Sequence, residues 1–339
     1  MLEPVKIGNL TITAPVCLAP MAGCSTVIYR TICHEFGAGF CPTELSSARS
    51  VRYSGIGKSF RYMRIDPGSE GITSIQLFGN DPEDFDHAVR AICEDGSLGR
   101  VSMFDINMGC PVPKVVKTGA GSALIKTPEL AGEVVRAAKK AASEYGKPVT
   151  VKTRTGFDHQ GESRDLIKAV LDGGADMVCI HARTRAQMYS GVADWDTMAE
   201  LAGIVRSYNV PFFANGDIRD VDSAARCISQ TGASGIMVGR AAMGNPWLFA
   251  QLANKFCGGS YDDTPPTDLM RVQVLMRHLR ASCDIIREEV AVKEFRSIMP
   301  HYIKGMRGAA AIRMRLVSAS TVEEVKTILY RDLLGVDGK

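Results

Sequence analysis

The sequence lacks the marks of a metal-binding, secreted or membrane-spanning protein. No two of its ten cysteines stand in Cys-x-x-Cys spacing, so it contains no zinc-knuckle or thioredoxin-type motif, and we predict no metal site. No run of 18 apolar residues is present, so we expect no membrane span. Residues 7–29 carry no charge, but Pro15 and Pro20 interrupt the helix that a signal peptide needs. We therefore expect reduced thiols in a cytoplasmic protein.

A strong net charge is also missing, because 40 Lys and Arg stand against 37 Asp and Glu. Their distribution is uneven: residues 1–266 carry 27 basic and 28 acidic side chains, and residues 267–339 carry 13 and 9. Between Lys293 and Arg315 there is a single acid, Glu294. This basic stretch is either a solvated helix face or a surface that binds phosphates.

Short apolar runs alternate with amphipathic stretches over about 240 residues, which is typical of a (β/α)₈ TIM barrel of the α/β class. We predict its strands at Val16–Ala19, Phe40–Thr43, Thr73–Leu77, Met103–Asn107, Val149–Thr153, Met177–His181, Val210–Ala214 and Gly235–Val238. Helices are predicted between them at Pro128–Tyr145, Asp165–Asp172 and Asp222–Gln230. An open doubly wound sheet is the alternative, although eight parallel strands close more readily. The barrel is assigned to residues 1–257.

A second, helical domain is predicted from residue 267 to 339, after a Gly-, Asp- and Pro-rich linker at 258–266. Thr267 is the expected N-cap of its first helix. A second helix is expected at Val290–Ile303. The last is expected at Ser320–Leu334, where Ser320 and Glu323 have the spacing of a capping box.

Polar residues and two glycines stand where the predicted strands end, and in a (β/α)₈ barrel that edge carries the active site. They are Gln76, Asn107, Lys152, Arg154, His181, Arg183, Asn215, Gly216, Asp217, Gly239 and Arg240. Taken singly, Lys152 could be a paired charge and His181 a hydrogen-bonded core residue. Together they predict a binding site, in which Gly216 and Gly239 let backbone N–H groups approach an anion that Arg240 can pair with.

Cys110 stands in a Gly-Cys-Pro turn directly after the strand that ends near Met108. Pro111 keeps Cys110 out of the helical region, so the thiol is held at the mouth of the strand. This segment alone leaves two interpretations open: a small buried hydrophobe, or a group that does chemistry. Gly119-Ala120-Gly121 is interpreted as a loop, because it lacks the third glycine of a dinucleotide fingerprint.

Taken together, these motifs resemble the tRNA-dihydrouridine synthases, most of all the bacterial branch. The resemblance covers residues 7–335 and is carried by Pro20-Met21-Ala22-Gly23, Gln76, Asn107-Met108-Gly109-Cys110-Pro111, Gly119–Leu124, Lys152–Gly156, His181–Thr184, Asn215-Gly216-Asp217 and Gly239-Arg240. It implies an FMN-containing barrel, NADPH or NADH as electron donor, and a helical domain that helps to hold tRNA. We expect a monomer without an obligate protein partner.

The resemblance also implies a mechanism and a role for each residue. A hydride from reduced FMN reaches C6 of a uracil ring, and Cys110, as general acid, protonates C5 to give 5,6-dihydrouridine. The implied flavin contacts are Pro20, Met21 and Ala22 on the ring, Gln76 and Lys152 at its polar edge, His181, and, at the ribityl phosphate, Asn215, Gly216, Asp217, Gly239 and Arg240. The implied uracil contacts are Asn107, Lys152 and Arg183. The implied contacts to the tRNA backbone are Lys304, Arg307, Arg313 and Arg315.

Two other functions are considered. A flavin barrel that reduces a free small molecule such as a pyrimidine would have no use for the basic helical segment. An RNA-binding protein without catalysis would have no use for Cys110 and Lys152. The sequence departs from the family at Arg296-Ser297-Ile298, where many members have an Arg-Lys-His cluster, and Pro300 follows inside the expected helix. Which uridine, which tRNAs and which nicotinamide donor are used is not encoded in these motifs.

Overall fold

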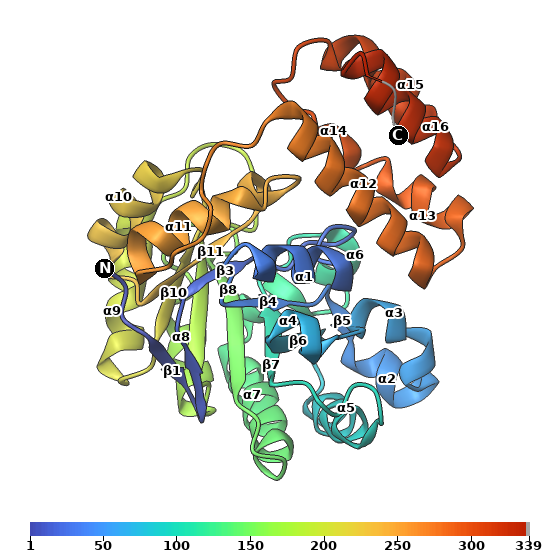
Figure 1. The fold of residues 1–339 in the computed structure, drawn as a ribbon. Coiled ribbons are helices and arrows are strands. Elements are labelled where there is room, and N and C mark those ends of the chain that lie inside the picture. Colours follow the sequence, from blue (N-terminus) through green and yellow to red (C-terminus); the bar gives the residue numbers. More distant parts are fainter. Residues whose placement is uncertain (337–339) are drawn as a thin grey trace.

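Eight parallel strands form the centre of the structure, a computed structural model that describes residues 1–336 (Figure 1). Their order is β3-β11-β10-β9-β8-β7-β6-β4, and the short β5 (Ser46–Ser47) pairs with the end of β6. The strand bounds are β3 Val16–Leu18, β4 Phe40–Pro42, β6 Ile72–Phe78, β7 Met103–Met108, β8 Val149–Gly156, β9 Met177–Thr184, β10 Phe212–Asn215 and β11 Gly235–Val238. The predicted α/β barrel is confirmed.

A close backbone approach joins the first and last strands of this order. The N–H of Gly39, just before β4, donates to the carbonyl oxygen of Val16 in β3 at 2.9 Å. A Cβ at Gly39 would lie only 1.9 Å from the carbonyl oxygen of Ala14, so a side chain cannot be accommodated here. This seam distinguishes the barrel from the open sheet that was the alternative.

A β-hairpin that the sequence analysis did not predict lies at the amino end of the barrel. Its strands are β1 (Val5–Ile7) and β2 (Leu10–Ile12), paired antiparallel. Ile7 and Ile12 are buried in one apolar cluster with strand residues such as Phe213. The hairpin therefore adds to the apolar filling at this end and leaves the carboxyl ends of the strands for the site.

Helices surround the barrel and cover its outer face, as Figure 1 shows. The longer ones are α1 (Val27–Glu35), α5 (Pro82–Glu94), α7 (Pro128–Ser143), α8 (Arg164–Asp172), α9 (Trp195–Ser207), α10 (Val221–Thr231) and α11 (Trp247–Cys257). Short helices in the loops are α2 (Ala48–Ser54), η1 (Ile56–Lys58), α3 (Phe60–Met63), α4 (Pro67–Glu70), α6 (Pro113–Val116), η2 (Gly121–Lys126) and η3 (Arg240–Ala242). None of the helices in residues 1–336 has the length and apolar character needed to cross a membrane.

A helical unit follows the barrel and lies beyond α1 in Figure 1. It consists of α12 (Asp268–Ile285), α13 (Glu288–Phe295), α14 (Met299–Tyr302), α15 (Ala309–Ser318), α16 (Val322–Thr327) and η4 (Ile328–Leu333). The side chain of Thr267 caps α12 by accepting from the N–H of Met270, as its position predicts. The last three residues of the predicted domain, 337–339, lie outside the described residues.

Three details of this unit differ from the prediction. The single helix expected at Val290–Ile303 is wrong. The ring of Pro300 and its missing N–H do not fit a helix interior, so α13 ends at Phe295 and α14 begins at Met299, with Pro300 in its first turn. The last helix is capped one residue later than expected, because Thr321 accepts from the N–H of Glu324 at 3.2 Å. Helix α15 was not predicted.

Aromatic packing fixes the helical unit to the barrel. The ring of Tyr29 on α1 stacks on His278 of α12 with 5.2 Å between centroids. The Nδ1 atom of His278 is 3.0 Å from the hydroxyl of Tyr302, and the hydroxyl of Tyr29 donates to the carbonyl oxygen of Ala242 in the barrel. All three rings are buried, so this contact is continuous with the protein core.

His278 should make the stability of the protein dependent on pH. Burial, with a smaller effect of Arg277, lowers the pKa of His278 to about 3, against 6.5 for an ordinary histidine. The unfolded chain therefore binds more protons below pH 6.5, and the free energy of unfolding should fall by ~2 kcal/mol between pH 7 and pH 5 on this account. Urea denaturation of the wild type and of His278→Gln at both pH values measures it.

The control for this comparison is His87→Gln, because His87 is exposed on α5. This variant should retain the wild-type difference between pH 7 and pH 5, whereas in His278→Gln the difference should be smaller by ~2 kcal/mol, the contribution of His278. An equal loss of stability in His278→Gln and the wild type would contradict the assignment.

Candidate active site at the carboxyl ends of the strands

A chain of side-chain hydrogen bonds connects the Cys110 loop to a buried carboxylate. The Oδ1 atom of Asn107 accepts from the N–H groups of Gly109 (3.2 Å) and Cys110 (2.9 Å). Its Nδ2 donates to Oε1 of Gln76 at 2.9 Å, and Nε2 of Gln76 donates to Asp105 at 2.6 Å. The two backbone N–H groups at one end and Asp105, which accepts at the other, together fix which way both amides point.

Asp105 is a residue that the sequence analysis did not single out. It is 1% exposed, and its second oxygen accepts from the hydroxyl of Thr150 at 2.5 Å. Burial raises the pKa of Asp105, while the hydrogen bonds from Thr150 and Gln76 lower it. Strand register brings the three together, because Asp105 pairs with Gln76 on one side and with Thr150 on the other. The one available signal was an acid inside an apolar strand.

The Cys110 loop is also held from the opposite side. The N–H and hydroxyl of Ser122 donate to the carbonyl oxygen of Cys110 at 3.2 and 2.9 Å. Gly121 has a φ of +62°, and a Cβ there would come within 3.2 Å of the Cβ of Cys110. The thiol is half-buried, and burial raises the pKa of Cys110 above its ordinary value of 9.0. Cys110 is therefore protonated at neutral pH.

Arg154 ties two loops of the site together. Its Nε donates to the carbonyl oxygen of Gly109 at 2.7 Å, and its Nη1 donates to those of Thr184 and Met188 at 2.9 Å each. Burial lowers the pKa of Arg154 to about 10, which still leaves the guanidinium charged at neutral pH. Arg154 thus joins the Cys110 loop to the loop that follows β9.

Lys152 of β8 and Asn215 of β10 are hydrogen bonded over the intervening strand β9. The Nζ of Lys152 donates to Oδ1 of Asn215 at 3.0 Å, and Nδ2 of Asn215 donates to the carbonyl oxygen of Met237 at 2.6 Å. Burial lowers the pKa of Lys152. The ammonium group has two further N–H bonds, so it can still donate to a ligand.

The carboxylate of Asp217 pairs with three arginines. Its carboxylate lies 2.7 Å from Arg183, 3.3 Å from Arg240 and 3.4 Å from Arg219. Burial works against ionisation, but the N–H of Ala193 and the guanidinium of Arg183 together hold the pKa of Asp217 below its ordinary value. Arg183 is buried and also donates to two backbone carbonyls of the loop at 190–191.

Two buried polar atoms beside these cations have no partner in the structure: Nδ1 of His181 and Nη1 of Arg183. Burial and the neighbouring charges of Lys152 and Arg154, among others, hold the pKa of His181 well below its ordinary value, so the ring is neutral. Gly216 has a φ of +119°, a conformation that favours glycine. The site therefore offers unused donors and an excess of positive charge, which suits a ligand that carries an anionic group.

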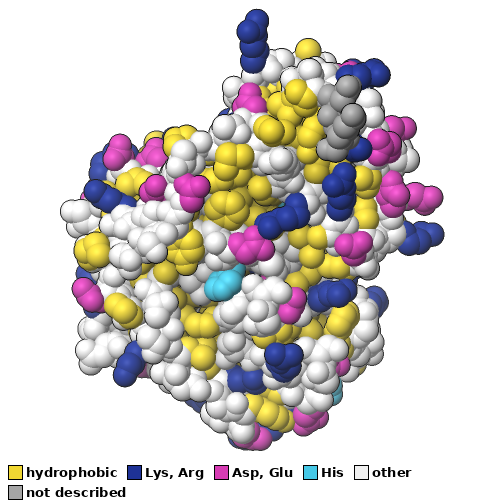
Figure 2. Space-filling model, in the orientation of Figure 1, with side chains coloured by type: hydrophobic (Ala, Val, Ile, Leu, Met, Phe, Trp, Pro, Cys, Tyr) yellow, Lys and Arg dark blue, Asp and Glu magenta, His cyan; other side chains and the backbone are white. Residues whose placement is uncertain are grey.

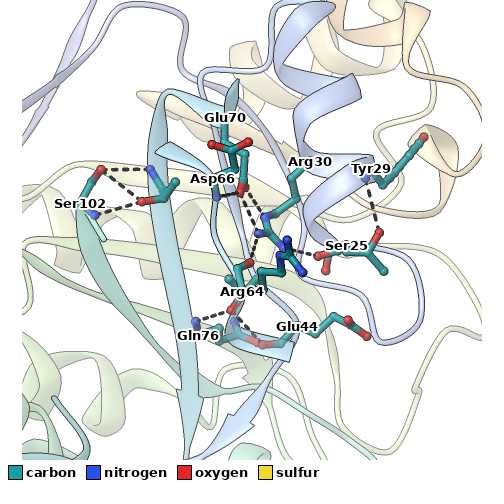
Figure 3. A network of polar contacts seen from close by, with 12 residues as sticks. Ser25, Tyr29, Arg30, Glu44, Arg64, Asp66, Glu70, Gln76 and Ser102 are labelled. Atoms are coloured by element: carbon teal, nitrogen blue, oxygen red, sulfur yellow. Dashed lines mark hydrogen bonds and ion pairs between the residues drawn. The ribbon is translucent and has the colours of Figure 1, made fainter. Parts of the chain in front are cut away.

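The loop at Pro20–Gly23 is positioned by the network drawn in Figure 3. Glu44 accepts from the N–H of Gly23 at 2.6 Å. Arg30 donates to the carbonyl oxygen of Ser25 at 2.6 Å and is held by a buried ion pair with Glu70, also at 2.6 Å. Pro20 and Met21 are half-buried and Ala22 is exposed. This loop forms the rim of the site at β3.

The basic residues of the helical unit lie apart from this site. Lys304, Arg307 and Arg313 are exposed, whereas Arg315 is paired with Asp332 at 2.6 Å. Arg296, where the sequence departs from the family pattern, donates to the carbonyl oxygen of Ala319 at 2.8 Å and so holds the end of α15.

Comparison with known proteins gives a consistent result. The family model described as dihydrouridine synthase (Dus) matches residues 17–334. A protein of Mycobacterium tuberculosis named "Probable tRNA-dihydrouridine synthase" is 35% identical over 96% of this chain and 84% of its own length. The "tRNA-dihydrouridine synthase B" of Pseudomonas putida is 32% identical over 93% of this chain and 90% of its own.

One solved structure shares the barrel at low sequence identity. A 2-naphthoyl-CoA reductase in complex with 2-naphthoyl-CoA has a TM-score of 0.58 and 10% identity, over 76% of this chain. The match spans about half of the length of that reductase, 52%. It supports the fold.

Alkylation kinetics should report the protonated state of Cys110. Because the thiolate reacts and burial raises the pKa of Cys110, its alkylation by iodoacetamide should be slow at pH 7. The rate should rise about tenfold for each pH unit and continue to rise past pH 9. Peptide mass spectrometry of the native protein measures this rate, with free cysteine as the reference. A plateau below pH 8 would show an activated thiolate instead.

Proposed function

Because the chain belongs to the dihydrouridine synthase family, we propose that it reduces the C5–C6 double bond of uridines in tRNA to 5,6-dihydrouridine. The observation that carries this proposal is the position of the Cys110 thiol just after β7, in a loop held by the Asn107–Gln76–Asp105 chain. The assignment to an enzyme family made from the sequence is confirmed by the family match and the relatives.

The cofactor we propose is FMN, and the residues present fit it. The partnerless atoms of His181 and Arg183, together with the exposed Arg240, suit an oxygen-rich, phosphate-bearing ligand. The proposed contacts are Pro20, Met21 and Ala22 on the ring, Gln76, Lys152 and His181 around it, and Asn215, Gly216, Gly239 and Arg240 toward the phosphate. Asp217 acts through its arginines. When bound, FMN supplies a hydride to C6 of the uracil after reduction by NADPH or NADH.

Cys110 supplies the proton in this proposal. A group that must donate a proton at neutral pH has to be protonated there, and the raised pKa of Cys110 meets that condition. The fixed backbone on both sides of Cys110 holds Sγ in one place, which suits protonation of C5 on one face of the ring. A strongly acidic thiol would be a nucleophile instead.

The uracil edge offers two carbonyl oxygens, which need donors. Asn107 has one N–H left after its bond to Gln76, and Lys152 has two after its bond to Asn215. Arg183 has only Nη1 available, because its other nitrogens are engaged. We therefore assign the uracil contacts mainly to Asn107 and Lys152.

The helical unit, residues 267–339, is proposed to hold the tRNA while residues 1–257 carry out the reaction. A target base must leave its stack to reach the thiol, at a cost of ~2–3 kcal/mol or more, so contacts elsewhere on the tRNA are needed. Lys304, Arg307 and Arg313 are exposed and can contact phosphates, whereas Arg315 must first leave Asp332.

Removal of the thiol tests the proposed reaction. Cys110→Ala should retain FMN but lose about 10²–10⁴-fold in turnover of unmodified tRNA with NADPH, the usual contribution of a general acid. Cys110→Ser, whose hydroxyl is a much weaker acid, should be similarly impaired. Dihydrouridine is measured by mass spectrometry of the digested tRNA. Full turnover by Cys110→Ala would remove the thiol from the reaction, and turnover of free uridine with none of tRNA would favour a small-molecule reductase.

Asp105 should act as a positioning residue. In Asp105→Asn the side chain can both donate and accept, so Gln76 loses the partner that holds its amide in one direction, and the support of Asn107 is weakened. We expect about a 10–100-fold loss in kcat, corresponding to ~1–3 kcal/mol for a misplaced buried group, together with a changed absorbance spectrum of the bound flavin. Thr150→Val keeps the carboxylate and should retain the wild-type spectrum. An unchanged spectrum in Asp105→Asn would contradict this role.

A further inference from the structure

A second basic surface lies on the barrel, far from the helical unit in sequence. Residues 48–64, which follow β5, contain five basic residues and no Asp or Glu: Arg49, Arg52, Lys58, Arg61 and Arg64. It also carries two exposed aromatic rings, Tyr53 (66% exposed) and Tyr62 (40% exposed). Positive charge interleaved with exposed aromatic rings is characteristic of surfaces that bind single-stranded nucleic acid.

The charges of this segment are only partly neutralised. Arg52 is held by Glu83 at 2.9 Å and by Asp84 at 3.1 Å. Arg61 is paired with Glu294. Within residues 1–336, no acidic group lies within 4.0 Å of the side-chain nitrogens of Arg49, Lys58 or Arg64. These three are exposed and can pair with phosphates.

Tyr53 is arranged so that a base can stack on it. Arg49, one helical turn before it on α2, lies 5.6 Å from the centre of the ring, and Arg52 lies 5.2 Å from it. Because α5 anchors Arg52 through Glu83 and Asp84, the guanidinium beside the ring is held in place. The ring is two-thirds exposed, which leaves area for a flat ligand.

This segment borders the site already described. Ser46 and Ser47, which lead into α2, pair with Leu77 and Phe78, directly after Gln76. At its other end Arg61 forms an ion pair with Glu294 of α13 at 2.6 Å. In Figure 1, α2 and α3 lie beside the barrel below α13, and Figure 2 shows basic side chains on this side of the molecule below the helical unit.

We propose that the segment 48–64 is a second RNA-binding surface, which takes the strand next to the target uridine by stacking an unpaired base on Tyr53 and pairing Arg49, Lys58 and Arg64 with phosphates. The inference rests on the proposed function, because it names where the same substrate is held. The expected ligand is single-stranded or loop RNA, since a base inside a duplex has no free face.

The test measures the affinity of the full-length holoprotein for an unmodified tRNA transcript between 0.05 and 0.3 M salt, by fluorescence anisotropy. The double variant Arg49→Gln/Arg64→Gln should bind roughly tenfold more weakly at about 0.15 M salt, and the slope of log Kd against log salt should fall by about 1.4–1.8, because two phosphate contacts are lost. Tyr53→Ala should weaken binding about fivefold or more with an unchanged slope, and Tyr53→Phe should restore it.

The matched control is Arg136→Gln, because Arg136 is exposed on the outer face of α7. It should bind as the wild type does. Wild-type affinity and slope in Arg49→Gln/Arg64→Gln would overturn this inference while leaving the proposed function in place. A wild-type protein that neither binds nor reduces the transcript would overturn both.

Discussion

The direction of the hydrogen bonds around Cys110 is set by one buried carboxylate. Asp105 can only accept, so Gln76 must turn its NH₂ group toward it and its oxygen toward Asn107. Asn107 then has its oxygen free for the backbone of the Cys110 loop, and one N–H remains for a ligand. A neutral amide of the same size at this position would offer a donor as well as an acceptor, so Gln76 would lose its fixed partner on that side. The support of the Cys110 loop therefore depends on a side chain that does not touch it.

A second carboxylate organises the other half of the site in the same way. Asp217 pairs with Arg183 and Arg240. Burial, together with the charges of Lys152, Arg154 and these two arginines, lowers the pKa of His181 and keeps its ring neutral. The two acids have opposite surroundings, since Asp105 is bound by neutral donors and Asp217 by guanidinium groups. Asp105 orders the end of the site that contains the Cys110 thiol, and Asp217 orders the end that suits an anionic group.

The sequence predicted the barrel and the rim residues because both follow from local patterns. Apolar runs at regular spacing mark the strands, and the polar residues after them must meet at one edge. Asp105 and Arg154 were not assigned roles, because their partners come from neighbouring strands and loops and depend on register. The hairpin was missed because β1 and β2 alternate apolar and polar residues over only three positions each and contain no continuous apolar run. Helix α15 was missed and the helix at Val290–Ile303 was misjudged because Gly305, Gly308 and Pro300 break any simple periodicity.

The packing of Tyr29, His278 and Tyr302 also bears on the distance between the helical unit and the Cys110 thiol. Tyr29 belongs to the barrel and His278 to the helical unit, and both rings are buried. Turning the helical unit against the barrel would therefore separate these stacked rings and expose apolar area. The span from the helical surface to the Cys110 thiol is therefore constant. If the helical unit holds the RNA as proposed, the nucleotide that reaches the thiol is the one at this distance from the bound part of the RNA. A different nucleotide would be presented to the thiol only if the RNA-binding contacts lay elsewhere on the surface of the helical unit.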